Sequence, residues 1–255
     1  MSETTYNPFS LAGKTILVTG ASSGIGRATA VECAKMGAAV ILSARNPQRL
    51  QETLSLLPAG NHAVVPADLG SEDAAKTLVD NLPAGTKLDG VVHCAGIDIR
   101  QLVKFIKEED FLLTMRTNLV APVLLNKWLL KRKALADAAS VVFISSIAAC
   151  KATITQSTYA ASKAGLIGAM RVFAKENMPR GIRGNCICPA MVDSGMITAA
   201  SLGISEEEFL ADRAKYLGNR YASPLEVAQM VVYLLSDAAR WITGSVFQID
   251  GGYTL

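Results

Sequence analysis

Short apolar runs alternate with longer segments of helical periodicity along most of the chain. The runs are continuous rather than alternating in polarity, and they span 15–19, 39–43, 62–66, 90–93, 141–145, 183–188 and 245–249. Continuous apolar runs of this length are typical of strands that are buried on both faces of a sheet. The pattern therefore predicts about seven buried strands.

Helical patterns fill most of the gaps between these runs, at 25–36, 47–56, 72–82, 108–133, 159–176 and 224–236. Ser223 and Pro224 mark the start of the last one, because serine caps helix N-termini and proline suits the first turn. Strands that alternate with helices predict a doubly wound parallel sheet with helices on both faces. We expect a single α/β domain that spans residues 1–255.

The segment at about 190–222 interrupts this rhythm, since it contains only short helical patches and no strand-like run. It follows the carboxyl end of a predicted strand, which is where ligands bind in such sheets. A substrate-binding lid is the functional interpretation, and a plain connecting excursion is the alternative. Long loops are uncommon in compact domains unless they have a role, which favours the lid.

Composition limits the cellular compartment and the partners that we expect for the protein. Half of the residues are hydrophobic and 18% are charged, which argues against disorder. The net charge of +3 is too small to indicate a nucleic-acid binder. No apolar stretch is long enough to span a membrane, and residues 1–10 do not resemble a signal peptide. The five cysteines have neither disulfide nor metal-ligand spacing, so we expect reduced thiols, no metal and a cytoplasmic protein.

A glycine-rich loop lies between the first predicted strand and the first predicted helix. Its sequence is Thr19-Gly20-Ala21-Ser22-Ser23-Gly24-Ile25-Gly26. Glycines permit a tight turn and a close approach to a pyrophosphate, and the helix N-terminus supplies free N–H groups and a positive dipole end. The position between strand and helix favours a dinucleotide-binding loop over an ordinary turn, although the spacing is not that of G-x-G-x-x-G.

A second set of candidate residues lies in the middle of the chain. Tyr159 and Lys163 are four residues apart in a predicted helix and therefore share a face. A lysine ammonium beside a phenol favours the phenolate and lowers the pKa of tyrosine from its usual value of about 10. Ser146 follows the fifth apolar run and can hydrogen-bond the same substrate oxygen. The set suits proton transfer to a carbonyl or from an alcohol, whereas a lone Tyr/Lys pair is more often packing beside a solvated charge.

Together these motifs resemble the short-chain dehydrogenase/reductase family over nearly the whole chain, and most of all its 3-oxoacyl-[acyl-carrier-protein] reductases. The resemblance implies a Rossmann-type fold and a catalytic tetrad of Asn118, Ser146, Tyr159 and Lys163. It implies that Tyr159 gives a proton to the carbonyl oxygen, that Ser146 orients this oxygen, and that Lys163 lowers the pKa of tyrosine and binds the nicotinamide ribose. Asn118 would hold a water in the proton relay; the alternative is a polar residue that interrupts a helix.

The resemblance also implies which residues bind the dinucleotide. They are Gly20, Ser22, Ser23, Gly24, Ile25, Gly26, Arg45, Asp68, Leu69, Ala95, Gly96, Tyr159, Lys163, Pro189, Val192 and Ser194. Three positions depart from the family pattern, because Cys94 replaces an asparagine, Ala190 a glycine and Ser194 a threonine. The serine keeps the hydroxyl that would hold the nicotinamide carboxamide, while the other two changes affect local geometry.

The end of the second strand indicates the cofactor. Its sequence, Ser43-Ala44-Arg45-Asn46, has no acidic residue to bind the ribose 2′-hydroxyl of NAD. Arg45 can pair with a 2′-phosphate through charge-assisted hydrogen bonds, which predicts NADP(H). The alternative is that Arg45 is an ordinary exposed loop residue.

The expected function is NADPH-dependent reduction of a carbonyl group, in a substrate like a 3-oxoacyl thioester, to a secondary alcohol. The alternatives are a sugar, steroid or other secondary-alcohol dehydrogenase and a dinucleotide-binding regulatory protein without turnover. An acyl carrier protein is a candidate partner; it is acidic, so a basic surface near the pocket mouth would attract it. Arg180 and the run Lys131-Arg132-Lys133 are the candidates for that surface, although the run also suits a helix C-terminus.

The resemblance further implies a homotetramer with two-fold symmetry. The expected interfaces are 108–133 and 224–255, with Trp128, Leu129 and Trp241 as apolar candidates for burial between subunits.

Overall fold

A computed structural model describes residues 6–71, 73–193, 199 and 204–255. Its described part contains a seven-stranded sheet in the order β3-β2-β1-β4-β5-β6-β7, and every pair of neighbouring strands is parallel. The strands are β1 Thr15–Thr19, β2 Ala39–Ser43, β3 Ala63–Val64, β4 Leu88–His93, β5 Leu135–Ile144, β6 Arg183–Pro189 and β7 Val246–Ile249. The order reverses between β1 and β4, so the predicted doubly wound sheet is confirmed.

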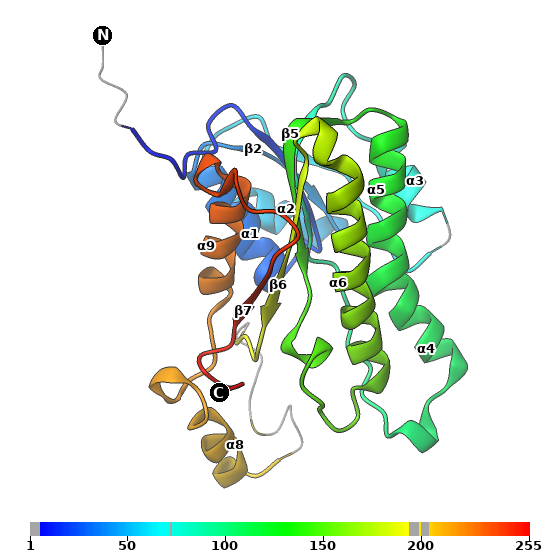
Figure 1. The fold of residues 1–255 in the computed structure, drawn as a ribbon, viewed down its shortest axis with the longest axis vertical. Coiled ribbons are helices and arrows are strands. Elements are labelled where there is room, and N and C mark those ends of the chain that lie inside the picture. The colour runs from blue at the N-terminus through cyan, green and yellow to red at the C-terminus, as the bar shows by residue number, and fades with distance from the viewer. Residues whose placement is uncertain (1–5, 72, 194–198, 200–203) are drawn as a thin grey trace.

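Helices cover both faces of the sheet (Figure 1). They are α1 Gly24–Lys35, α2 Pro47–Leu54, α3 Ala74–Asp80, α4 Glu108–Met115, α5 Ala121–Lys131, α6 Ser157–Asn177, α8 Glu206–Arg213 and α9 Pro224–Leu235. Side chains alternate along each strand, so Leu17 enters the core under α3, α5 and α6, while Ile16 and Val18 enter the core under α1 and α9. Both faces are therefore apolar, which explains the continuous runs in the sequence.

The prediction of one continuous helix over 108–133 is wrong. α4 ends at Met115, a π-helical turn spans Arg116–Val120, and α5 begins at Ala121. Proline has no N–H group, so Pro122 cannot donate a hydrogen bond to the carbonyl four residues earlier, which belongs to Asn118. The wide turn absorbs this defect, and such turns occur frequently at functional sites.

The carboxyl ends of the strands all lie at one edge of the sheet, the lower edge in Figure 1, where α8 also lies. α5 and α6 both begin near this edge and end at the opposite one. No helix in the described part of the chain is both long and apolar enough to cross a membrane.

Candidate active site

The glycine loop and the loop after β4 are in direct backbone contact. Gly20 has a φ of +66°, and a Cβ at this residue would lie 2.8 Å from the Ala95 nitrogen. A Cβ on Gly26 would overlap the Gly20 carbonyl. Side chains at either position would push the two loops and the start of α1 apart. The three segments therefore form a backbone cradle that fits a dinucleotide phosphate at a helix N-terminus.

Three side chains hold this cradle in shape. The Arg27 guanidinium donates to the Ser22 carbonyl at 2.7 Å, and the Thr53 hydroxyl donates to the Ala21 carbonyl at 2.9 Å. Thr19 Oγ1 accepts from the backbone nitrogens of Cys94 and Ala95, at 3.2 and 3.3 Å. Thr19 therefore ties the loop to the sheet at the place where Cys94 replaces the expected asparagine.

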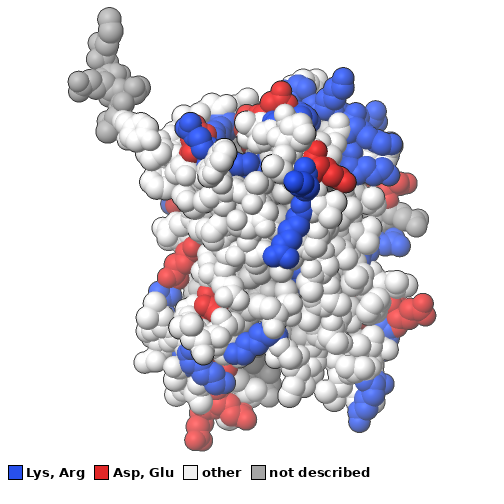
Figure 2. Space-filling model, in the orientation of Figure 1, with Lys and Arg blue, Asp and Glu red and all other residues white. Residues whose placement is uncertain are grey.

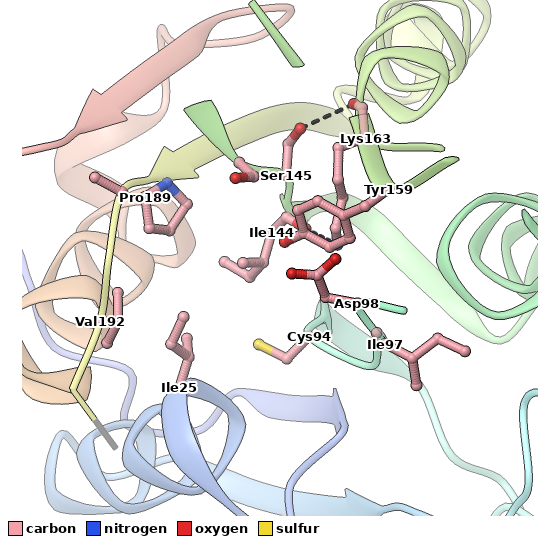
Figure 3. A pocket seen from close by; sticks show the side chains of 13 residues that line it. Ile25, Cys94, Ile97, Asp98, Ile144, Ser145, Tyr159, Lys163, Pro189 and Val192 are labelled. Carbon is pink, nitrogen blue, oxygen red and sulfur yellow. Dashed lines mark hydrogen bonds between the residues drawn. The ribbon is translucent and has the colours of Figure 1, made fainter. Parts of the chain in front are cut away.

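A cavity of about 220 Å³ opens beside the cradle, at the carboxyl ends of β4, β5 and β6. It brings together three of the four predicted catalytic residues with several of the predicted cofactor contacts (Figure 3). Its lining consists of Ile25, Cys94, Gly96, Ile97, Asp98, Ile144, Ser145, Ser146, Tyr159, Lys163, Pro189, Ala190 and Val192.

Tyr159 lies in the first turn of α6 and points into the cavity. Burial raises the pKa of Tyr159 to about 12, although its hydrogen bond with Ser146 acts in the opposite direction. Ser146 Oγ also accepts a hydrogen bond from the Ala148 nitrogen at 3.1 Å, which fixes the hydroxyl at the start of a short 3₁₀ turn.

Lys163 is almost fully buried behind Tyr159. Its ammonium donates to the Ile144 carbonyl at 2.8 Å and lies 5.6 Å from the centroid of the Tyr159 ring. Burial lowers the pKa of Lys163 to about 8. The sequence-based expectation of a lowered pKa for Tyr159 is therefore wrong for this geometry, because desolvation of the phenol is the dominant influence and the ammonium is directed at a backbone carbonyl.

Asn118 is fully buried in the π-helical turn and does not line the cavity. Its side chain accepts from the Ile97 nitrogen and donates to the Ile97 carbonyl, both at 2.9 Å, and it donates to Ser162 Oγ at 3.1 Å. A Cβ on Gly96 would lie 3.3 Å from both Asn118 Oδ1 and Lys163 Nζ. The amide thus holds the loop after β4 against the catalytic helix.

The remaining predicted cofactor residues lie at the ends of β2 and β3, away from the cavity. Arg45 is exposed directly after β2. Asp68 is also exposed, and its Oδ1 accepts from the Gly70 nitrogen at 3.1 Å, whereas Leu69 is buried. Ser194 lies outside the described residues. Within the described residues, no group of three or more His, Cys, Asp or Glu side chains is placed to hold a metal ion.

The C-terminal segment 250–255 joins the catalytic loop to the predicted lid. The ring of Tyr253 stacks on Tyr216, with centroids 4.7 Å apart and planes at 4°. The Lys151 ammonium lies 3.7 Å from the centroid of the same ring and donates to the Tyr253 carbonyl at 2.8 Å. The Leu217 nitrogen donates to the Gly251 carbonyl at 2.8 Å. We call these contacts the C-terminal latch.

The predicted lid closes at its base through backbone pairing. Val192 and Ala222 form a parallel bridge, and the Asp193 nitrogen donates to the Ala222 carbonyl at 2.8 Å. Residues 194–198 and 200–203 of this segment lie outside the described part of the chain. A role as lid stays a prediction.

Two contributions to the site were not predicted from the sequence. Asp98 places a carboxylate beside the Tyr159 ring (Figure 3). The sequence signal available for Asp98 was a polar residue two positions after Gly96, in the loop that follows a buried strand. The latch residues Lys151 and Tyr253 are 102 positions apart, and no local pattern joins them.

The basic residues expected at the pocket mouth lie at the opposite edge of the sheet. Figure 2 shows Lys and Arg side chains gathered over the end of α5, which contains Lys131. α6 has 21 residues, which at 1.5 Å per residue is about 30 Å of helix between Tyr159 and the turn with Arg180. Arg180 is paired there with Asp137 at 2.9 Å. Arg180 and Lys131 therefore lie away from the pocket of their own chain, and a docking surface for a carrier protein stays a prediction.

A backbone cradle for a dinucleotide, next to a cavity lined by serine, tyrosine and lysine, defines the class as a dinucleotide-dependent oxidoreductase of α/β fold. The family model described as enoyl-(acyl carrier protein) reductase matches residues 20–254. The chain belongs to the short-chain dehydrogenase/reductase family.

Three relatives illustrate the range of this family. The 3-oxoacyl-[acyl-carrier-protein] reductase of Rickettsia conorii is 34% identical, over 95% of this chain and 97% of its own length. Carbonyl reductase family member 4 of Danio rerio is 35% identical, over 94% of this chain and 97% of its own. A structure from Agrobacterium tumefaciens with NADP bound, assigned as a 2-deoxy-d-gluconate 3-dehydrogenase, has a TM-score of 0.87 at 30% identity and covers 98% of this chain and 99% of its own.

Proposed function

We propose that the protein reduces a ketone to a secondary alcohol with NADPH. The observation that carries the proposal is the meeting of Ser146, Tyr159 and Lys163 in one cavity beside the glycine cradle. The cofactor, when bound, supplies the hydride that reduces the carbonyl carbon.

The three side chains have distinct roles in this proposal. Tyr159 is protonated at neutral pH, since its pKa is about 12, and gives its proton to the carbonyl oxygen. Ser146 Oγ already accepts a hydrogen bond from the Ala148 nitrogen, so its own proton is available to orient that oxygen. An ammonium group has three donors, and Lys163 uses one on the Ile144 carbonyl, which leaves two for the hydroxyls of the ribose.

Two substrate classes are supported by different observations. A 3-oxoacyl thioester is supported by the similarity to the Rickettsia reductase, because that relative covers almost the whole chain. A small hydroxylated ketone of the sugar type is supported by the Asp98 carboxylate in the cavity and by the similarity to the Agrobacterium structure. The acyl carrier protein is not part of the proposal for a single chain, since the basic residues lie far from its pocket.

The test follows NADPH oxidation through the absorbance of the cofactor, with purified protein and a panel of ketones. The panel contains the acetoacetyl thioester of N-acetylcysteamine and neutral hydroxyketones. We expect turnover with at least one ketone and its loss in Tyr159→Phe. Absence of turnover with every ketone and both nicotinamide cofactors, in a folded protein that binds the cofactor, would leave the dinucleotide-binding regulatory protein as the better interpretation.

A further inference from the structure

One carboxyl side chain faces the cavity without a role in the proton transfer proposed above. Asp98 lies two residues after Gly96, in the loop at the carboxyl end of β4, and its side chain is 25% exposed. Figure 3 shows the carboxylate beside the ring of Tyr159 at the cavity. A substrate carbonyl that accepts a proton from the phenol must therefore come close to this carboxylate. A carboxylate is an acceptor only, so what it offers a substrate is a place for a hydrogen-bond donor.

The carboxylate is fixed by contacts that leave one oxygen available. Gln156, directly before α6, donates from Nε2 to Asp98 Oδ2 at 2.5 Å, and Arg100 donates from Nε to the same oxygen at 3.0 Å. Among the described residues, no hydrogen bond is made to Asp98 Oδ1. Two donors therefore orient the group, while its second oxygen can accept a bond from a ligand.

We propose that Asp98 is a specificity residue, whose Oδ1 accepts a hydrogen bond from a hydroxyl group adjacent to the reacting carbonyl. The pocket then prefers hydroxyketones over unsubstituted ketones and disfavours keto acids, whose carboxylate would meet a like charge. This inference rests on the proposed function and selects the hydroxylated substrate class within it.

The charge of Asp98 also reaches the proton donor. Asp98 raises the pKa of Tyr159, while Ser146 and Arg100 lower it and Cys188 raises it further. Lys163, on the same helix as Tyr159, feels Asp98 as well. If Asp98 only braced its loop through Gln156, replacing the carboxylate with an amide would leave the substrate preference unchanged.

The experiment uses a matched trio: 1-hydroxy-2-butanone, 2-butanone and 2-oxobutanoate. A hydrogen bond to a charged group corresponds to a preference of roughly ten- to a hundredfold. We expect kcat/KM of the wild type for the hydroxyketone to exceed that for 2-butanone by this factor. Asp98→Ala should bring the ratio of these two kcat/KM values close to the ratio of the intrinsic reactivities of the two ketones. Asp98→Asn should raise the activity on 2-oxobutanoate relative to that on the hydroxyketone.

A control variant separates this effect from a general loss of loop structure. Asp110→Ala removes another carboxylate of the region, which accepts from Gln101 at 2.8 Å and does not line the cavity, and it should leave the ratio unchanged. In the reverse reaction with NADP⁺ and a secondary alcohol, Asp98→Asn should lower the kinetic pKa assigned to Tyr159, which a purely structural role would not do.

The outcomes distinguish the two proposals. Reduction of ketones with the same hydroxyl preference in the wild type and in both Asp98 variants would overturn the inference and leave the proposed function intact. A wild-type preference for 2-oxobutanoate would overturn it as well. Failure to reduce any ketone would overturn the proposed function itself, and the inference with it.

Discussion

At the scale of single residues, burial sets the chemistry of the cavity. It raises the pKa of the Tyr159 phenol and lowers that of the Lys163 ammonium, because both charged forms lose contact with water. The phenol is therefore held in its protonated form, while the lysine still carries its charge at neutral pH and loses it at a lower pH than an exposed lysine does. This arrangement favours proton donation, and it makes the lysine costly for folding.

The proton donor is tested by Tyr159→Phe, which keeps the ring and removes the hydroxyl. We expect kcat to fall by about 10²- to 10⁴-fold, the usual contribution of a general acid, with little change in KM. Tyr233→Phe, a change in α9 outside the cavity, is the matched control. Turnover close to that of the wild type would contradict the role given to Tyr159.

The cost of burying the lysine is tested by Lys163→Met. The pKa of Lys163 is about 8 in the folded chain, against 10.5 for a lysine side chain exposed to water as in the unfolded chain. Below pH 8 the lysine is charged in both the folded and the unfolded state, so the folded state bears the full free-energy cost of desolvating the charge. Between the two pKa values the folded state loses its proton first, so this cost disappears as the pH rises. We expect the variant to gain up to about 3 kcal/mol at pH 7 and less at pH 10, reduced by the lost bond to the Ile144 carbonyl.

Urea unfolding of Lys163→Met and wild type at both pH values measures this difference directly. A stability difference that does not change with pH would show that the ammonium is not desolvated in the folded protein. Both curves share every other titrating group, so their difference isolates the lysine.

The cofactor preference is tested by Arg45→Ala. Loss of a charge-assisted hydrogen bond to the 2′-phosphate should reduce the ratio of kcat/KM for NADPH to that for NADH by roughly ten- to a hundredfold. Arg240→Ala, another exposed arginine outside the glycine cradle, should leave the ratio unchanged. Equal use of both cofactors by the wild type would contradict the preference itself.

At the scale of elements, apolar periodicity located most strands and helices, because the central strands are buried on both faces. β1 and β2 lie at the predicted residues, and Ser223 caps α9 as predicted, with Glu226 completing a capping box. The π-helical turn was not predicted, because apolar periodicity does not reveal the loss of one backbone hydrogen-bond donor. Pro122 was the sequence signal for that loss.

The candidate site was predictable to the extent that its residues lie in one motif. The glycine loop, Ser146, Tyr159 and Lys163 are each marked by local spacing, and the cavity brings the last three together. The latch and the direction of the Asp98 carboxylate arise from contacts between distant segments, which a one-dimensional pattern does not contain.

The latch is tested by Tyr253→Ala, which removes the stacking on Tyr216 and the ring beneath Lys151. Because the latch connects the catalytic loop to 205–222, we expect a severalfold rise in KM for the ketone and a smaller change in kcat. Tyr253→Phe keeps the ring and the backbone carbonyl and should resemble the wild type. An unchanged KM in Tyr253→Ala would show that the C-terminal segment does not shape the pocket.

At the scale of the whole molecule, one apolar surface remains uncovered. Leu112 and Leu113 on α4, Val120 in the π-helical turn and Val123 on α5 are between 41% and 53% exposed. An exposed apolar row of this kind along successive helical segments is typical of a subunit interface, which supports the expected homotetramer. Leu129, however, is fully buried in the core of its own chain and was wrongly assigned to the interface, whereas Trp241 is 97% exposed.

Assembly is tested by Leu113→Glu combined with Val123→Glu, which places charges in the apolar row. Light scattering at micromolar concentration should give a tetramer for the wild type and a smaller species for the double variant. Leu56→Glu, a change at a leucine with 55% exposure after α2, is the matched control. A monomeric wild type would contradict the expectation.

The gathering of all cavity-forming loops at one edge of the sheet has a consequence for how such proteins diverge. The two apolar layers that determine stability contain none of the catalytic side chains, and the loops at 96–101, 145–156 and 250–255 contribute little to either layer. Substitutions that redirect substrate choice can therefore accumulate at this edge without passing through unstable intermediates. Stability and substrate choice are then encoded largely in different residues, which allows relatives that share about a third of their residues to keep one sheet while they diverge in the molecules they act on.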